Sequence, residues 1–371
     1  AMRVALYEGS WEKYHKGTKF ATEDNHTEFF QEVMKWGDEQ FFKSKLALNT
    51  KDTDKEYVNA EDAFAHLFNK KDLSQIQEAV LWKKYSVADG VFHRLGALLA
   101  SGAVDGQGPS GLSKSLVDNY LNADGTFINP KDEKYKDFNE MFKERDARLL
   151  VTVMHSGPDC KYRASSPTNK PMNVRAYDAT GTEDEMKEKN EDIVSPNLNG
   201  DGNSKSVTGF HIRLGIDTTY VDNESETVVV LFRYAEGLLC YAEAAEELDL
   251  CTDDVLNKTL KPLRERAGVT YVKPTKADPN FPFTGLSPVL QEIRRERRSE
   301  LALQGFRLDD LMRWAVAGTL KGQDGRGRGA YLGEDGVLYK SFSPKGRESL
   351  KLVLKDNDGW TDPLQQYLPQ G

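Results

Sequence analysis

The sequence predicts a mainly α-helical fold, in which stacked helical hairpins pack against an irregular region with a few short strands. Three observations predict it. Apolar residues recur at spacings of three and four between Thr227 and Leu248. Two runs with helix-end signals follow, over 252–268 and 287–305. The segment 3–46 contains two more helical patterns, which together predict a further hairpin.

The run from Thr227 to Leu248 is predicted to be one long helix around which the rest of the chain is organised. Several positions of its apolar stripe are alanine, and small side chains let a second helix approach closely. Helix pairs stacked in this way bury the core of tetratricopeptide-like repeats. The stripe consists of Leu231, Tyr234, Ala235, Leu238, Leu239, Ala242 and Ala245.

Two further helices are predicted from the residues at their ends. The helix over 252–268 carries two aspartates near its positive end and a glycine at its stop, and it forms a hairpin with the run before it. The helix over 287–305 begins with Ser287 as a candidate cap and Pro288 in its first turn, and it closes at a glycine.

The other segments are less regular. The run at 73–85 fits either a helix or a strand, and a strand is favoured at 80–85. Further strands are predicted at 149–155 and 209–216. Polar and Gly-rich composition predicts loops over 89–125, 157–206 and 315–336, the first of which ends in a short helix and a turn at Asp124 and Gly125.

Composition and charge exclude several classes of protein. With 38% hydrophobic and 29% charged residues, the chain falls among globular rather than disordered proteins. Its 371 residues are enough for a sizeable core, in one large domain or two. The net charge of −9 argues against a general nucleic-acid binder. No apolar run approaches the roughly 20 residues of a membrane-spanning helix. No signal peptide precedes the first helix, which indicates an intracellular protein or a fragment without its leader.

Cysteine and histidine usage predicts neither a disulfide framework nor a metal site. The chain has an odd number of cysteines, at Cys160, Cys240 and Cys251, and none of them shows CxxC spacing. Cys240 is expected to be a small core residue. The six histidines form no pair of the HExxH kind. The segment NLNGDGN at 197–203 resembles a calcium loop but lacks the bidentate glutamate. The sequence therefore predicts no metal and no cofactor.

Three motifs carry a resemblance to a known family. They are RYAEGLLCYAEAAEEL at 233–248, LKPLRERAGV at 260–269 and VLQEIRRERRSELALQGFRLDDLMRW at 289–314. In this order and spacing they resemble the C-terminal core of the SusD/RagB family, which are nutrient-binding lipoproteins of the outer membrane in Gram-negative bacteria. Weaker matches are collinear, so the resemblance covers nearly the whole chain. It implies a SusD-like fold.

The chain departs from that family at both ends. It lacks the family's signal peptide, lipid-bearing cysteine and first helices, and it stops before the usual closing segment. A fragment is therefore the preferred interpretation. The resemblance implies a place on the cell surface at the outer membrane, through a lipid anchor outside this chain. It also implies a SusC-like TonB-dependent transporter as partner.

The charged residues of the third motif have two interpretations. Paired carboxylates beside arginines are compatible with a glycosidase site, but they do not specify one. Alternating charges at helical spacing more often form ion-pair networks, and we expect a structural network here. Trp314 is expected to be a packing residue, and Glu236 and Glu243 to cap helices or pair with arginines. The network residues are Arg297, Arg298, Arg307, Glu296, Glu300, Asp309 and Asp310.

Ligand recognition is expected in the loops, because a sugar site needs exposed aromatic faces beside polar side chains. Core packing is an equally good interpretation for each candidate, and a better one for Trp82, which alternates in phase with Val80. The leading candidates are Trp82, Tyr85, Phe92, His93 and Arg94, whose position resembles that of ligand-contacting loops in SusD-like proteins. Further candidates are Tyr162, Arg163, Tyr177, Asn197 and Asn199, and Trp360 is expected to pack against the absent tail.

Three functions remain open at this point. The first is a surface receptor that binds glycans, or peptides as in RagB-like proteins, and delivers them to the transporter without catalysis. The second is a helical-repeat scaffold for protein partners, and the third is a glycoside hydrolase, for which no segment argues. We expect residues 1–371 to form one unit, with 1–50 and 225–320 as helical scaffold and 51–224 and 321–371 as the loop-rich ligand-binding region. The hairpins at 3–46 and 227–268 are expected to need each other to cover their apolar faces.

Overall fold

The protein is mainly helical, as expected. The computed structural model describes residues 1–21, 23–50, 59–94, 111–155, 206, 208–216, 224–317, 328–342, 344–350, 353 and 355–362. The strands are β1 (Ala79–Lys83) and β2 (Val229–Arg233), which pair antiparallel. The helices are α1 (Met2–His15), α2 (His26–Trp36), α3 (Ala60–Asn69), α5 (Lys114–Val117), α6 (Ala147–Thr152), α8 (Tyr234–Glu247), α9 (Asp253–Lys258), α10 (Leu260–Arg266), α11 (Pro288–Glu300), α12 (Arg307–Arg313), α13 (Val337–Ser341) and α14 (Pro344–Leu350). A π-helical turn (Gly37–Phe41) extends α2, and two 3-10 turns lie at Glu133–Lys136 and Glu140–Phe142.

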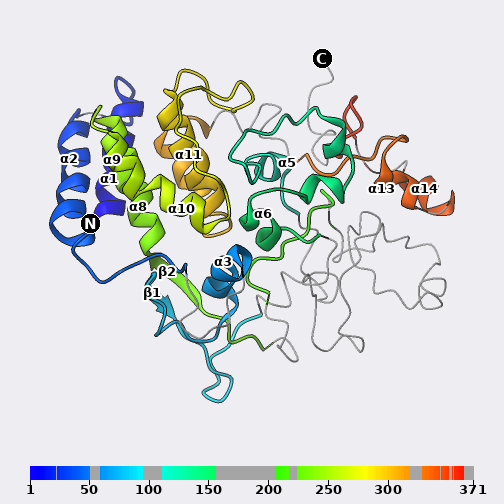
Figure 1. The fold of residues 1–371 in the computed structure, drawn as a ribbon, viewed down its shortest axis with the longest axis horizontal. Helices are drawn as coiled ribbons and strands as arrows, with labels where there is room; N and C mark the ends of the chain where they lie inside the picture. Colours follow the sequence, from blue (N-terminus) through cyan, green and yellow to red (C-terminus); the bar gives the residue numbers. More distant parts are fainter. Residues whose placement is uncertain are drawn as a thin grey trace.

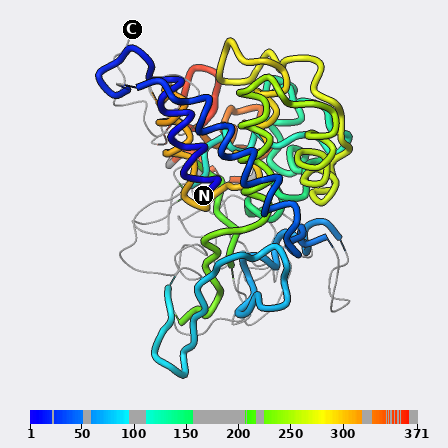
Figure 2. Tube along the Cα trace, turned by 90° about the vertical axis from the view of Figure 1, so that its left-hand side faces the viewer, coloured from blue at the N-terminus to red at the C-terminus, as the bar shows by residue number. Residues whose placement is uncertain are grey.

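Helices α1 and α2 form the predicted N-terminal hairpin and pack against α8 (Figures 1 and 2). Gly9 permits their close approach, because a Cβ there would meet ring carbons of Phe30 at 3.0 Å. The shared core contains Leu6, Phe30 and Val33 from the hairpin and Cys240 and Ala244 from α8. Cys240 is a buried core residue, as predicted. The small side chains of α8 thus let both helices of the hairpin bury their apolar faces against it.

The prediction of a single helix from Thr227 to Leu248 is wrong in its first third. Residues 229–233 form β2, and α8 begins only at Tyr234. The valines at 228–230 are β-branched and favour extended backbone, and β1 supplies the partner strand. Arg233, at φ −142° and ψ 159°, marks the change from strand to helix. Leu231 therefore belongs to an exposed strand rather than to the apolar stripe.

The next two predicted helices form, with different limits. The one over 252–268 is divided into α9 and α10 at Thr259, because Pro262 cannot donate the hydrogen bond that would continue α9. Ser287 caps α11 as predicted: its hydroxyl accepts from the Leu290 amide at 3.0 Å, and Pro288 follows it. Helix α11 ends at Glu300, and turns lead to Gly305 at φ +87°.

The strand predicted at 149–155 is wrong. Residues 147–152 form α6, which Asp146 caps by accepting from the Arg148 amide at 2.9 Å. The strand predicted at 209–216 is not formed either, and an isolated bridge joins Val153 to Ile212. The strand prediction at 80–85 is confirmed by β1, and the turn at Gly125 by its φ of +84°.

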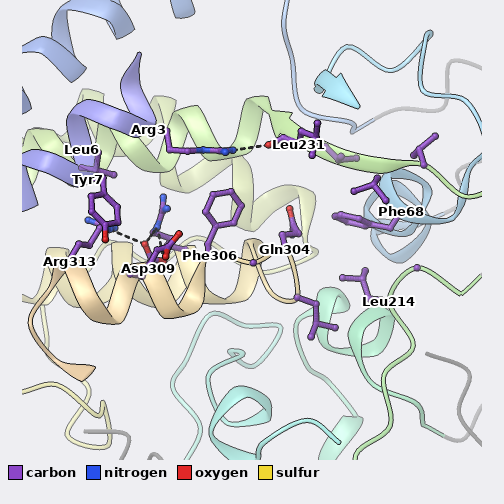
Figure 3. Close-up of a pocket in the computed structure, with 18 of the residues that line it drawn as sticks. Arg3, Leu6, Tyr7, Phe68, Leu214, Leu231, Gln304, Phe306, Asp309 and Arg313 are labelled. Carbon is purple, nitrogen blue, oxygen red and sulfur yellow. Dashed lines mark hydrogen bonds and ion pairs between the residues drawn. The ribbon is translucent and has the colours of Figure 1, made fainter. Parts of the chain in front are cut away.

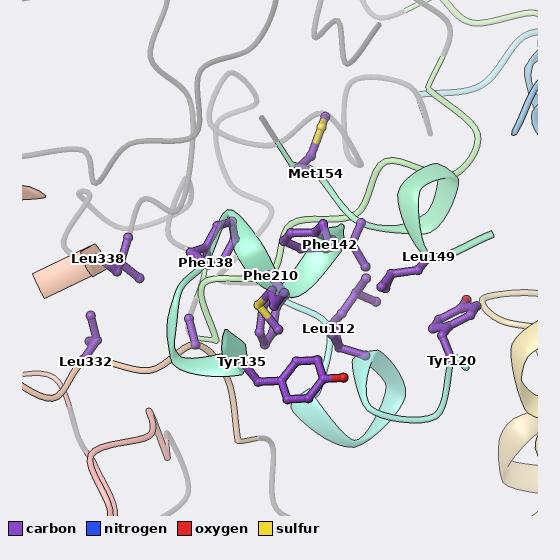
Figure 4. Close-up of a cluster of buried hydrophobic side chains, with 14 of the residues drawn as sticks. Leu112, Tyr120, Tyr135, Phe138, Phe142, Leu149, Met154, Phe210, Leu332 and Leu338 are labelled. Atoms are coloured by element: carbon purple, nitrogen blue, oxygen red, sulfur yellow. The ribbon is translucent and has the colours of Figure 1, made fainter. Parts of the chain in front are cut away.

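The irregular region has a hydrophobic core of its own (Figure 4). Phe138 stacks on Phe210 at 5.7 Å, and Leu332 and Leu338 join them from the C-terminal segment. Helices α13 and α14, which follow in that segment, were not predicted from the sequence. Trp360 is 8% exposed and packs edge-on against Tyr331 at 5.1 Å, so the expectation that it packs on an absent tail is wrong.

Candidate functional site

The acidic residues of α11 form a buried ion-pair network rather than a catalytic pair. Glu296 and Glu300 are 1% and 0% exposed. Burial alone would raise the pKa of the Glu300 carboxyl, but three guanidinium groups outweigh it and hold that pKa well below its usual range. An ionised carboxylate held in this way is a poor proton donor. The ion pairs join Glu300 to Arg148, Arg233 and Arg266, and Glu296 to Arg148 and Arg264.

A second buried network connects α8 to α12. Glu243 accepts from Arg313 at 2.6 and 2.7 Å and from the Trp314 indole at 2.6 Å. Burial opposes ionisation of Glu243, but Arg313 outweighs it and lowers the pKa of Glu243 to about 2. Trp314 is buried, and Glu236 pairs with Arg3. The structural roles predicted for Trp314, Glu236 and Glu243 are confirmed.

Four of the leading candidates for ligand binding, Tyr85, Phe92, His93 and Arg94, lie on a β-hairpin that projects beyond β1 and β2, and Trp82 lies in β1 itself. The hairpin is the cyan loop at the bottom of Figures 1 and 2. Ser86 and Val91 exchange backbone hydrogen bonds of 2.7 and 2.9 Å, and Gly90 closes the turn at φ +68°. His93 in turn exchanges backbone hydrogen bonds with Ser225, at 3.1 and 2.8 Å. The hairpin is thus tied to the segment that leads into β2.

The side chains of this hairpin divide into two groups. The Tyr85 and His93 rings meet edge to face at 4.5 Å, and the His93 ring contacts the Thr227 carbonyl at 2.7 Å, so both hold the hairpin together. Phe92 is 42% exposed, and Arg94 is exposed as well. Trp82 is half-buried.

The phase argument for core packing of Trp82 fails, because its in-phase neighbour Val80 is 50% exposed while Trp82 is half-buried. The other candidates, Tyr162, Arg163, Tyr177, Asn197 and Asn199, lie outside the described residues.

An apolar cleft of about 500 Å³ lies between α1, β2 and the α11–α12 connection. Figure 3 shows Arg3 and Leu231 on one side of it and Gln304, Phe306 and Asp309 on the other. The Arg3 guanidinium is 4.8 Å from the centre of the Phe306 ring and donates to the Leu231 carbonyl at 2.7 Å. This cleft was not predicted from the sequence, because five segments that are far apart in the chain form its walls.

A polar cavity of about 410 Å³ lies on the far side of α11. Its walls come from α5, α11, the 128–131 and 278–282 loops and residues 328, 358 and 360. The Arg298 guanidinium lines it and donates to the Ser115 hydroxyl at 2.8 Å. In the described part of the chain no carboxylate pairs with Arg298, so its predicted place in the ion-pair network is wrong. The network prediction is confirmed for Arg297, which pairs with Asp310 at 2.8 Å.

Arg307 and Asp309 also depart from the predicted network. The Arg307 guanidinium is 5.5 Å from the centre of the Phe283 ring, and no carboxylate among the described residues pairs with it. Asp309 is exposed at the rim of the apolar cleft. No group of His, Cys, Asp and Glu side chains in the described ranges is arranged to hold a metal ion.

Comparison with known proteins assigns the family. Residues 74–352 match the SusD family, and the chain belongs to it. A SusD-like carbohydrate-binding protein from Bacteroides fragilis NCTC 9343 is similar in structure, with a TM-score of 0.58 and 20% identity over 97% of this chain and 57% of that one. A second SusD-like protein from the same organism gives 0.53 and 18%, over 90% and 56% of the two chains. No curated protein matches the sequence.

Membership has direct consequences. It confirms the family that the three sequence motifs indicated. The predicted SusD-like fold is confirmed. The chain spans a little over half the length of the two structures it resembles, 57% and 56%. None of the helices in the described ranges combines the length and apolar character that a bilayer crossing requires.

Proposed function

We propose that this protein captures glycans at the cell surface and delivers them to a SusC-like TonB-dependent transporter, without catalysis. The observation that carries the proposal is membership of the SusD family. It is supported by the similarity to a structure described as a carbohydrate-binding protein. The pairing of the α11 carboxylates with arginines also supports a role without acid–base chemistry.

The projecting hairpin and the end of β1 that leads into it supply suitable groups for a sugar. Phe92 and Trp82 offer aromatic surface on which the C–H faces of a sugar ring stack, and Arg94 supplies hydrogen-bond donors for hydroxyls. Tyr85 and His93 fix the base of the hairpin, so that little order has to be gained on binding. We propose this hairpin as part of the glycan site.

Attachment to the outer membrane belongs to the same proposal, through a lipid anchor outside this chain. So does the folding of residues 1–371 as one unit, which the packing of α1 and α2 on α8 supports. Limited proteolysis tests that part, and two separately stable halves would contradict it.

Titration calorimetry against a panel of neutral and acidic oligosaccharides tests glycan binding. Phe92→Ser and Trp82→Ala are each expected to weaken binding about five-fold, because each removes stacking surface worth about 1 kcal/mol. Val80→Ser is the matched control, since it removes an exposed apolar side chain of β1 that carries no ring. If no glycan of the panel binds, or if the three variants change the affinity equally, the proposal is contradicted.

A peptide ligand is a second candidate, and the apolar cleft favours it. Leu231, Phe306 and Phe68 line the cleft, and apolar walls suit amino-acid side chains better than sugar hydroxyls. Phe306→Ala would then weaken peptide binding without affecting glycans. A peptide library measured beside the glycan panel separates the two candidates.

A further inference from the structure

The polar cavity carries more positive than negative charge. Five cationic side chains and three anionic ones line it. Most of these charges are paired: Lys114 with Asp118, Arg295 with Asp278 at 2.5 Å, and Arg328 with Asp356 at 2.9 Å. Arg298 is the cationic group of α11 that remains without a carboxylate in the described part of the chain. Lys131, the other cation of the wall for which no ion pair is seen, is exposed to water, so Arg298 is the partly buried cation that lacks a counter-charge.

The surroundings of Arg298 make this charge costly. Arg295, one turn earlier on α11, contacts Glu292 at 2.8 Å as well as Asp278, whereas Arg298 has one neutral hydroxyl as partner. Burial, together with the positive charge of Arg307, lowers the pKa of Arg298 to about 9. A desolvated guanidinium binds a carboxylate strongly, because it offers two parallel N–H donors. An anionic ligand in this cavity would supply the missing counter-charge.

Other groups in the cavity suit a sugar better than a simple anion. The Asp118 Oδ1 atom is buried and has no hydrogen-bond partner among the described residues, so it can accept from a ligand hydroxyl. Asn280 adds a side-chain amide to the wall. The rings of Trp360 and Phe281 supply apolar surface, although Lys114 lies 4.4 Å from the centre of the Trp360 ring and covers part of it. The volume of about 410 Å³ lies within the range of small-molecule sites.

We propose that the polar cavity is a subsite for an acidic sugar, with the sugar carboxylate on Arg298 and a sugar hydroxyl donating to Asp118 Oδ1. The proposal rests on the proposed glycan-binding function and specifies the class of glycan. A peptide C-terminus offers the same carboxylate. The sugar is favoured because Asp118 and Asn280 provide partners for hydroxyls that an apolar peptide side chain would leave unpaired.

The test compares two ligands by titration calorimetry: an oligogalacturonate and the neutral galactose oligomer of the same length. The wild-type protein is expected to bind the acidic oligomer at least ten-fold more tightly. Arg298→Met should abolish that preference and leave the affinity for the neutral oligomer unchanged, and Arg298→Lys should keep part of it. Arg307→Met tests whether loss of a nearby positive charge is enough: Arg307 is also half-buried but does not line the cavity, so most of the acidic preference should remain in this variant. Circular dichroism of each variant checks its folding.

Several outcomes would overturn the proposal. The two oligomers could bind with equal affinity, or the preference for the acidic oligomer could survive in Arg298→Met. Either result would show that Arg298 does not bind the sugar carboxylate in this cavity. Competition by a tripeptide with a free C-terminus, as strong as that by the uronate, would assign the cavity to peptides. If neutral glycans bind through the hairpin and acidic glycans bind no more tightly, the cavity proposal fails and the proposed glycan-binding function stands. Absence of binding by any glycan would refute the proposed function as well.

Discussion

Adjacent arginines on α11 show two different uses of the same residue type. The Arg297 guanidinium lies on the Asp310 carboxylate, at 2.8 and 2.9 Å, between α11 and α12. The Arg298 guanidinium faces the polar cavity on another side of the helix, with the Ser115 hydroxyl as its partner. Removing a charge from water costs several kcal/mol unless a partner compensates for it. Paired arginines therefore hold the helices together, and Arg298 retains binding capacity for a ligand.

The largest effect is expected from Glu300→Gln. Glu300 is fully buried among Arg148, Arg233 and Arg266, so the substitution leaves three buried cations short of counter-charge. Breaking such a buried pair typically costs about 3–5 kcal/mol of unfolding free energy. Urea denaturation followed by circular dichroism measures it. A loss below about 1 kcal/mol would mean that the network contributes little to stability.

Acid should lower the stability that the buried pair of Glu243 and Arg313 contributes. The pKa of Glu243 falls from 4.5 to about 2 on folding, so its contribution to stability is complete above pH 4.5 and is lost as the pH falls toward 2. That contribution is roughly 3 kcal/mol. Urea denaturation between pH 7 and pH 3 should therefore show falling stability below pH 4.5, with a shallower fall in Glu243→Gln. An identical pH dependence in the two proteins would contradict the assignment.

A smaller effect of opposite sign is expected at the cavity. Arg298→Met removes a poorly compensated cation but keeps most of the side-chain volume, so unfolding free energy should rise by about 1 kcal/mol. Arg297→Met, at the neighbouring position, should lower it because Asp310 would remain buried without its partner. Urea denaturation of the two variants side by side measures both. Equal losses would show that the two arginines do not differ in the way proposed.

The smallest effect is expected at the surface. Lys261 and Glu265 form an i,i+4 pair at 3.8 Å on α10, and both are exposed. Because water screens such a pair, Glu265→Gln should change unfolding free energy by less than about 0.5 kcal/mol. This variant calibrates the measurement on Glu300→Gln, and a change above 1 kcal/mol would remove the distinction between buried and exposed pairs.

Sequence patterns predicted the helical scaffold well and the candidate site only in part. The stripe of α8 and the cap at Ser287 are local signals, and both are present in the structure. The hairpin residues from Trp82 to Arg94 do lie together, because they are neighbours in the chain. The polar cavity was missed, since α5, α11 and residue 360 are far apart in sequence.

By itself, the sequence determined where helices can form and to which family the chain belongs, because periodicity, caps and motifs are properties of neighbouring residues. Tertiary structure decided the rest. Residues 229–233 became a strand once β1 offered a partner, and Arg148 found Glu300 at a separation of 152 residues. A buried arginine stabilises the fold where a carboxylate distant in sequence pairs with it, and it can bind a ligand where none does. Only the folded chain determines the distance between the guanidinium and that carboxylate.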